Sequence, residues 1–241
     1  WLTINEYQGL IKNYSSLGLV QLSNYILPLI TLPYLSRILG VDFFGLIMMA
    51  QAIMIYLTII TDYGFNLSAT KEIAKNRDNL SKISEIFCSV FLIKTTLLVI
   101  SFLILMGIVE LIPLFKTHAL LFYFSFLIVV GNTFLPTFLF QGIEKMSFLA
   151  FFNLFAKIGF TGLIFIVIQS SSDYYLVHGL WGLSYIVVNL VSFYIIVTKL
   201  QIKLKIPAIS TIKTYYKLSF EYFLSRVAVA VYLNANIIII G

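Results

Sequence analysis

The stretch NYILPLITLPYLSRILGVDFFG, residues Asn24–Gly45, decides the fold class of this chain. It is the second half of an apolar run in which no charged residue occurs from Asn13 to Ser36. At about 1.5 Å per residue in a helix, that run is long enough to cross a hydrocarbon layer of roughly 30 Å. The sequence therefore predicts a first membrane-spanning helix at residues 14–36.

One face of that helix is polar. Gln21, Asn24, Pro28 and Thr31 follow one another at three- and four-residue spacing, which places them on one side of a helix. Such groups are costly against lipid, but they are tolerated against other helices or a water-filled cavity. Two interpretations stay open: a packing face with a proline defect, or the wall of a transport path. In the second, Gln21, Asn24 and Thr31 bind substrate, and Pro28 and Pro33 are gating positions.

The composition of the whole chain fits a membrane protein. Of its 241 residues, 60% are hydrophobic and 11% are charged, whereas a soluble domain has about 25% charged residues. We expect an all-α, polytopic transmembrane helix bundle with six complete spans and part of a seventh. The chain begins with Trp1 and ends inside an apolar run, so we also expect a fragment of a longer protein. The predicted spans are residues 14–36, 43–61, 86–109, 119–139, 148–168, 180–198, and from 218 onward.

The basic residues of the loops predict the orientation of the bundle. Cytoplasmic loops of membrane proteins carry an excess of Lys and Arg, and the loops on the N-terminal side hold eleven such residues against two, Arg37 and Lys116, on the other side. We therefore expect a cytoplasmic N-terminus. The spread of these charges over separate loops argues against a nucleic-acid partner. The eleven are Lys12, Lys71, Lys75, Arg77, Lys82, Lys145, Lys199, Lys203, Lys205, Lys213 and Lys217.

Three cations lie inside otherwise apolar spans: Lys94, Lys157 and Arg226. Each costs about 2.5–3.5 kcal/mol at mid-bilayer on insertion scales, and no acidic residue lies within four positions of any of them. All three sit nine or ten residues from the inner end of their spans, which is roughly 14 Å deep. If their helices face one cavity, they form a cationic ring that attracts an anionic substrate. The alternative is that each side chain extends back to the interface.

Other motifs say less about the function of the chain. The sequence has no phosphate-binding P-loop pattern, so we expect no ATP hydrolysis, no enzymatic activity and no cofactor. His118 and His178 have no ligand partners at metal spacing, and we expect both to be solvated loop residues and no metal site. Cys88 lies in an apolar run and is expected to be a buried, inert thiol.

Three stretches carry a resemblance to a known family. Asn24–Gly40 followed by Phe44–Leu46, then DYGFNLSAT at Asp62–Thr70, and FQGIEKM at Phe140–Met146 occur in this order. Together they resemble the Wzx-type O-antigen and polysaccharide flippases, which belong to the multidrug/oligosaccharidyl-lipid/polysaccharide exporter superfamily. The match covers Leu17 to about Arg226.

The resemblance implies a location, a cargo and partners. The protein would lie in the bacterial inner membrane and move an undecaprenyl-pyrophosphate-linked oligosaccharide from the cytoplasmic to the periplasmic face by alternating access. Its partners would be this lipid-linked oligosaccharide, the lipid bilayer, a coupling cation (proton or sodium), a polysaccharide polymerase and a chain-length regulator. The family has two six-helix halves, so residues 1–205 would form the first lobe and 206–241 the start of the second.

Two acids within the shared motifs invite functional roles. Asp62, at the inner end of the second predicted span, is a candidate proton carrier, and Glu144, in the turn after the fourth, is a candidate gating contact. A plain structural role is an equal alternative for each.

Two other functions compete with a polysaccharide flippase. One is an exporter of the same superfamily with another cargo, lipid II or a small drug; exporters of cationic drugs should favour intramembrane acids, whereas this chain has cations. The other is a membrane-embedded glycosyltransferase or polymerase, which needs a large soluble loop or paired catalytic carboxylates. Here the outer loops are short, and their acids, Asp42, Glu110 and Asp173, lie on separate connections.

The predicted orientation is tested with reporter fusions. A reporter fused after Lys82 or Lys205 should be cytoplasmic, and one fused after Asp173 should be external, because the basic loops stay inside. A cytoplasmic reporter at Asp173 would contradict the orientation and the depth assigned to the three cations.

Overall fold

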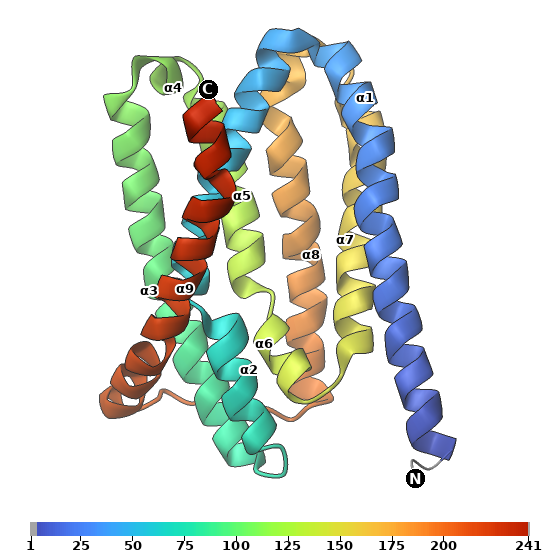
Figure 1. Cartoon of the computed structure of the whole chain (residues 1–241), viewed down its shortest axis with the longest axis vertical. Helices are drawn as coiled ribbons and strands as arrows, with labels where there is room; N and C mark the ends of the chain where they lie inside the picture. The colour runs from blue at the N-terminus through green and yellow to red at the C-terminus, as the bar shows by residue number, and fades with distance from the viewer. Residues whose placement is uncertain (1–3, 241) are drawn as a thin grey trace.

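The computed structural model describes the backbone of residues 4–240 and the side chains of Leu22, of residues 25–230 and of Tyr232. This described part is helical and contains no strand (Figure 1). Its elements are α1 (Ile4–Asp62), α2 (Phe65–Lys75), α3 (Leu80–Leu111), α4 (Pro113–Thr117), α5 (Ala119–Phe134), α6 (Thr137–Gly142), α7 (Met146–Val167), η1 (Ser171–Tyr175), α8 (Leu176–Thr198) and α9 (Ile209–Ile240).

The expected polytopic helix bundle is confirmed. Within the described residues, five helical segments are long and apolar enough to cross a membrane. The first, Tyr25–Lys75, includes most of the first predicted span and all of the second. These two spans meet at Gly40, which interrupts α1 with φ 74° and ψ 173°, a left-handed φ that favours glycine. The helix continues through Pro28 and Pro33, and Gly40 is its one non-helical position.

Figure 1 shows how the loops divide between the two ends of the bundle. The start of α1, the α2–α3 turn, the α6–α7 turn and the linker from α8 to α9 lie at one end. The bend of α1 and the short helix α4 lie at the other. The loops that carry the eleven basic residues therefore share one end of the molecule, which we call the basic end.

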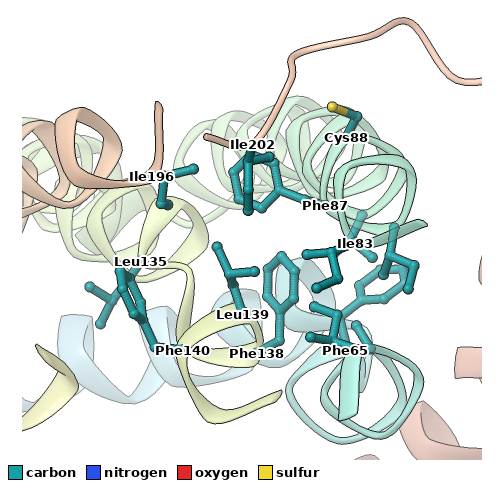
Figure 2. Close-up of a cluster of buried hydrophobic side chains, with 14 of the residues drawn as sticks. Phe65, Ile83, Phe87, Cys88, Leu135, Phe138, Leu139, Phe140, Ile196 and Ile202 are labelled. Carbon is teal, nitrogen blue, oxygen red and sulfur yellow. The ribbon is translucent and has the colours of Figure 1, made fainter. Parts of the chain in front are cut away.

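Two hydrophobic clusters hold the helices together. The cluster nearer the basic end joins α2, α3 and α6, where Phe138 and Leu139 pack among Phe65, Ile83 and Phe87 (Figure 2). The second cluster joins α1, α5 and α8 toward the opposite end, with Leu39, Ile47, Phe122 and Val177 among its buried members. Helix α6 can enter the first cluster because Pro136 ends α5 and redirects the chain after Leu135.

Glycines allow the closest helix contacts. In α8, a Cβ atom on Gly182 would lie 2.4 Å from the carbonyl carbon of Leu127 in α5. In α6, a Cβ atom on Gly142 would lie 2.6 Å from the Cβ of Ile73 in α2. Small residues at helix interfaces let backbones approach in this way, and packing of this kind is what holds membrane helices together.

We predict that Gly182→Ala lowers the thermal stability of the protein in detergent, at a cost of about 1–3 kcal/mol, because the added methyl group must displace the backbone of α5. Gly162→Ala in α7 is the matched control, because a Cβ atom there meets nothing within 4 Å. Equal melting temperatures for the two variants would contradict the close α5–α8 contact.

Candidate functional site

The end of α1 places an acidic side chain inside the bundle. Asp62 is the last residue of α1, and the chain then turns through Tyr63 (φ 46°) and Gly64 (φ 76°) before α2 begins. The carboxylate of Asp62 is buried, and neither of its oxygens accepts a hydrogen bond from the described residues. A buried carboxylate that is ionised and accepts no hydrogen bonds requires a nearby positive charge.

Two of the intramembrane cations supply that charge. The ammonium of Lys94 in α3 lies 3.6 Å from one carboxylate oxygen of Asp62, and the guanidinium of Arg226 in α9 lies 3.8 Å from the other. The side chains of Lys94 and Asp62 are 3% and 7% exposed, whereas that of Arg226 is 43% exposed. Asp62 and Lys94 therefore form a buried pair, and Arg226 is its accessible third member.

Helix α9 reaches this pair by close packing on the turn after α1. A Cβ atom on Gly64 would lie 2.9 Å from the backbone nitrogen of Phe223, so the turn admits α9 because it has no side chain there. Tyr63 stacks on Tyr216 and Phe223 at centroid distances of 4.5 and 4.8 Å. These contacts place α9 so that Arg226 lies beside Asp62.

Arg226 also lines a cavity of about 650 Å³, which we call the arginine cavity. Helices α1, α5, α8 and α9 contribute to its wall. Its polar lining includes Gln51, Thr58, Asn132 and Ser225, and the indole of Trp181 covers one side. A cavity of this size, mostly apolar with a few convergent polar groups, is typical of a small-molecule binding site.

Lys157 lines a neighbouring cavity of about 370 Å³, which we call the lysine cavity. Pro28 and Thr31 of α1, Thr161 of α7 and His178 of α8 also line it. Gln51 and Trp181 belong to both cavities, so they form the partition between them.

The three intramembrane cations thus do not face one common cavity. Arg226 and Lys157 line separate cavities that adjoin at Gln51 and Trp181, and Lys94 lines neither, because it is buried against Asp62. The expectation of a single ring is replaced by two cationic cavities and one internal ion pair.

The polar face of the first span is only partly described. Thr31 is buried in the lysine cavity, where its hydroxyl donates to the carbonyl of Leu27 at 3.0 Å, and Pro28 lies beside it. Pro33 is exposed and lines neither cavity. The side chains of Gln21 and Asn24 lie outside the described residues.

Glu144 lies far from the cavities, at the basic end. It adopts φ 58° in the α6–α7 turn, and its carboxylate pairs with the guanidinium of Arg77 at 2.6 Å. The Nε of Arg77 also donates to the carbonyl of Gly142 at 3.0 Å. Glu144 therefore joins the α6–α7 turn to the α2–α3 turn in an exposed contact.

The expectation that His178 is a solvated loop residue is wrong. Helix α8 begins at Leu176, four residues before the predicted span, and the imidazole of His178 is buried against α5. The hydroxyl of Ser125 is hydrogen-bonded to the carbonyl of Leu121 at 2.6 Å and to Nδ1 of His178 at 2.8 Å. Sequence reasoning did not identify three residues that line the arginine cavity: Gln51, Asn132 and Trp181. Each is a single polar or aromatic residue inside an apolar span, and that isolation is the signal that could have indicated them.

The Asp62–Lys94 pair gives an asymmetric prediction. Asp62→Asn should lower stability by about 3–5 kcal/mol, because it leaves the buried Lys94 uncompensated. Lys94→Met should cost less, because Asp62 keeps Arg226 at 3.8 Å. The double variant should lose less than the sum of the singles. Thermal unfolding in detergent measures all three, and additive losses would show that the pair is not coupled.

Comparisons with known proteins show which family the chain is related to. The chain is 33% identical over 233 residues to a protein of Escherichia coli (strain K12) named "Putative O-antigen transporter"; the match covers 97% of this chain and 56% of that protein. It is 29% identical over 232 residues to a Shigella dysenteriae protein of the same name, covering 95% of this chain and 58% of the relative. The chain thus spans little more than half the length of these curated relatives. No solved structure matches.

The family model described as polysaccharide biosynthesis protein matches residues 10–241, which is nearly the whole chain. The resemblance that the three sequence stretches carry is thereby confirmed. This chain is a multi-pass membrane protein, and it belongs to the polysaccharide biosynthesis protein family.

Proposed function

We propose that this chain supplies the first lobe, residues 1–205, and the opening helix of the second lobe of a flippase in the bacterial inner membrane, with its N-terminus in the cytoplasm. Its cargo is an undecaprenyl-pyrophosphate-linked oligosaccharide, which moves from the cytoplasmic to the periplasmic face by alternating access. No bond of the cargo is made or broken. The observation that carries the proposal is the pair of adjoining cavities, each with one cation in its wall.

The chemistry of the two cavities matches the two parts of such a head group. A pyrophosphate is anionic, and Arg226 presents a partly exposed guanidinium that can bind phosphate oxygens in a bidentate manner. The sugars are polar with apolar C–H faces, and the amides of Gln51 and Asn132 with the indole of Trp181 offer hydrogen bonds and a flat apolar surface. The lipid tail stays in the bilayer, so only the head group needs this path.

Asp62 gives the site a means of coupling to movement. Arg226 faces Asp62 on one side and the arginine cavity on the other. When a pyrophosphate takes the guanidinium, Asp62 keeps only Lys94, and the contact that holds α9 against α1 weakens. The carboxylate oxygens of Asp62 accept no hydrogen bond from the described residues. A proton or sodium ion bound there would also weaken the contact between Asp62 and Arg226, so Asp62 is the proposed site of the coupling cation.

A cationic drug is a poorer cargo for these cavities. Among their described lining residues, the charged side chains are Arg226 and Lys157, both cations. The nearby acid, Asp62, is buried against Lys94 and lines neither cavity. A positively charged ligand would therefore enter a repulsive field.

Export should depend on the sign of the cavity charges more than on side-chain shape. Lys157→Arg should retain most export, whereas Lys157→Ala, Lys157→Glu and Arg226→Ala should lose most of it. Insertion should be unaffected or improved, because a costly intramembrane charge is removed. Complementation of surface polysaccharide in a deletion strain, with protein level measured in the same membranes, gives both quantities.

Lys116→Ala is the matched control, because Lys116 is an exposed cation paired with Glu110 at 2.7 Å outside the cavities. It should export normally. Full export by Lys157→Ala and Arg226→Ala would mean that the cavity cations do not bind the cargo. Loss of export together with loss of protein from the membrane would instead show a structural role.

A further inference from the structure

Two further cavities, which share no lining residue with the arginine and lysine cavities, lie at the basic end. A cavity of about 200 Å³ is lined by Ser81 and Ser84 of α3 and by Lys203 and Lys205 of the linker between α8 and α9. An adjoining cavity of about 250 Å³ is lined by Arg77, by Lys145 and by apolar residues that include Ile83 and Ile202. Leu80 lines both, so the two cavities adjoin, and we call them together the linker cleft.

We propose that the linker cleft binds the phosphate head group of an anionic phospholipid from the surrounding leaflet. Two connections that are distant in sequence, the α6–α7 turn and the α8–α9 linker, bring lysines to the cleft, and apolar residues line most of the rest of it. Phosphate oxygens would accept hydrogen bonds from the ammonium groups, and the glycerol region would cover Ile83 and Ile202. Basic recesses between helices at the cytoplasmic side are a recognised form of lipid head-group site.

The lysines of the cleft are available for a ligand. Among the described residues, no carboxylate lies within ion-pair distance of Lys145, Lys203 or Lys205. Arg77, which also lines the cleft, differs in this respect because it pairs with Glu144. Lys82, next to Ser81 in sequence, likewise pairs with Glu85 at 3.1 Å. The cleft is therefore a local excess of positive charge at the rim of the bundle.

The linker is fixed in place by its backbone, which leaves its lysine side chains free to bind. The N–H of Lys203 donates to the hydroxyl of Ser84 at 3.1 Å, and the N–H of Lys205 donates to the sulfur of Cys88 at 3.4 Å. Ile202 is anchored in the first hydrophobic cluster beside Phe87, and Figure 2 shows Cys88 next to it. The cleft is thus preformed, which lowers the entropic cost of binding.

The depth of the cleft also fits a head group. Ser81 lies five residues, or about 8 Å, before the apolar stretch of α3 that begins at residue 86, which is roughly the thickness of one head-group layer. The helical face that carries Ser81 continues through Leu92, Val99 and Leu103, which are 43%, 56% and 61% exposed. An acyl chain attached at the cleft would lie along this apolar face.

The purified protein in detergent, titrated with phosphatidylglycerol and with phosphatidylcholine of the same acyl chains, tests the proposal. Native mass spectrometry counts retained lipids, and the melting temperature reports ligand binding by mass action. We expect selective retention of phosphatidylglycerol with a raised melting temperature. Lys203→Gln/Lys205→Gln should weaken this binding at least tenfold, whereas the control Lys213→Gln/Lys217→Gln, which removes two exposed lysines of α9, should not.

Three results would overturn the proposal. Equal losses in the two double variants would show diffuse attraction to basic loops in place of a site. Equal retention of phosphatidylcholine would remove the role of the head-group charge. Full stabilisation by inorganic phosphate would identify a soluble anion as the ligand. Because the readouts are lipid retention and melting temperature, the result does not depend on whether the protein exports a polysaccharide.

Discussion

The buried contact between Asp62 and Lys94 is the constraint on which the rest of the site depends. An isolated charge in this part of the bundle would be very costly, so each of the two residues requires the other. Their pairing fixes the end of α1 against α3. It also creates the position at which Arg226 meets a carboxylate, and so it decides where α9, the first helix of the expected second lobe, can dock. One internal ion pair thereby links the packing of α1 and α3 to their contact with α9.

The glycines and the chain breaks position the cavities around this contact. Gly64 lets α9 approach the turn after α1, and Gly182 draws α8 against α5, which brings Trp181 to the partition between the two cavities. Arg226 and Lys157 line the two cavities, whereas Lys94 is buried against Asp62.

The sequence predicted the helical segments well, and for a clear physical reason. A membrane-spanning helix must satisfy its own backbone groups and present apolar side chains to lipid, so its length and hydropathy are visible in the sequence. The division of the basic loops from the others is also visible in the sequence, because Lys and Arg are concentrated in the loops of one side, and Figure 1 places those loops at one end. The error at His178 arose because His178 and Gly179 interrupt the apolar run before residue 180, and burial against α5 is a tertiary property that the sequence does not show.

What the sequence by itself determined is the fold class, the family resemblance and the presence of unusual charges inside apolar spans. These are local properties, since each can be read from one stretch of chain. Only the tertiary structure decided which charges meet: Asp62 is 32 residues from Lys94 and 164 from Arg226, so no spacing rule connects them. The same is true of Gln51 and Trp181, which share a partition between two cavities. A charged residue inside an apolar span is visible in the sequence because it is costly in lipid. Which residue it pairs with depends on how the helices pack.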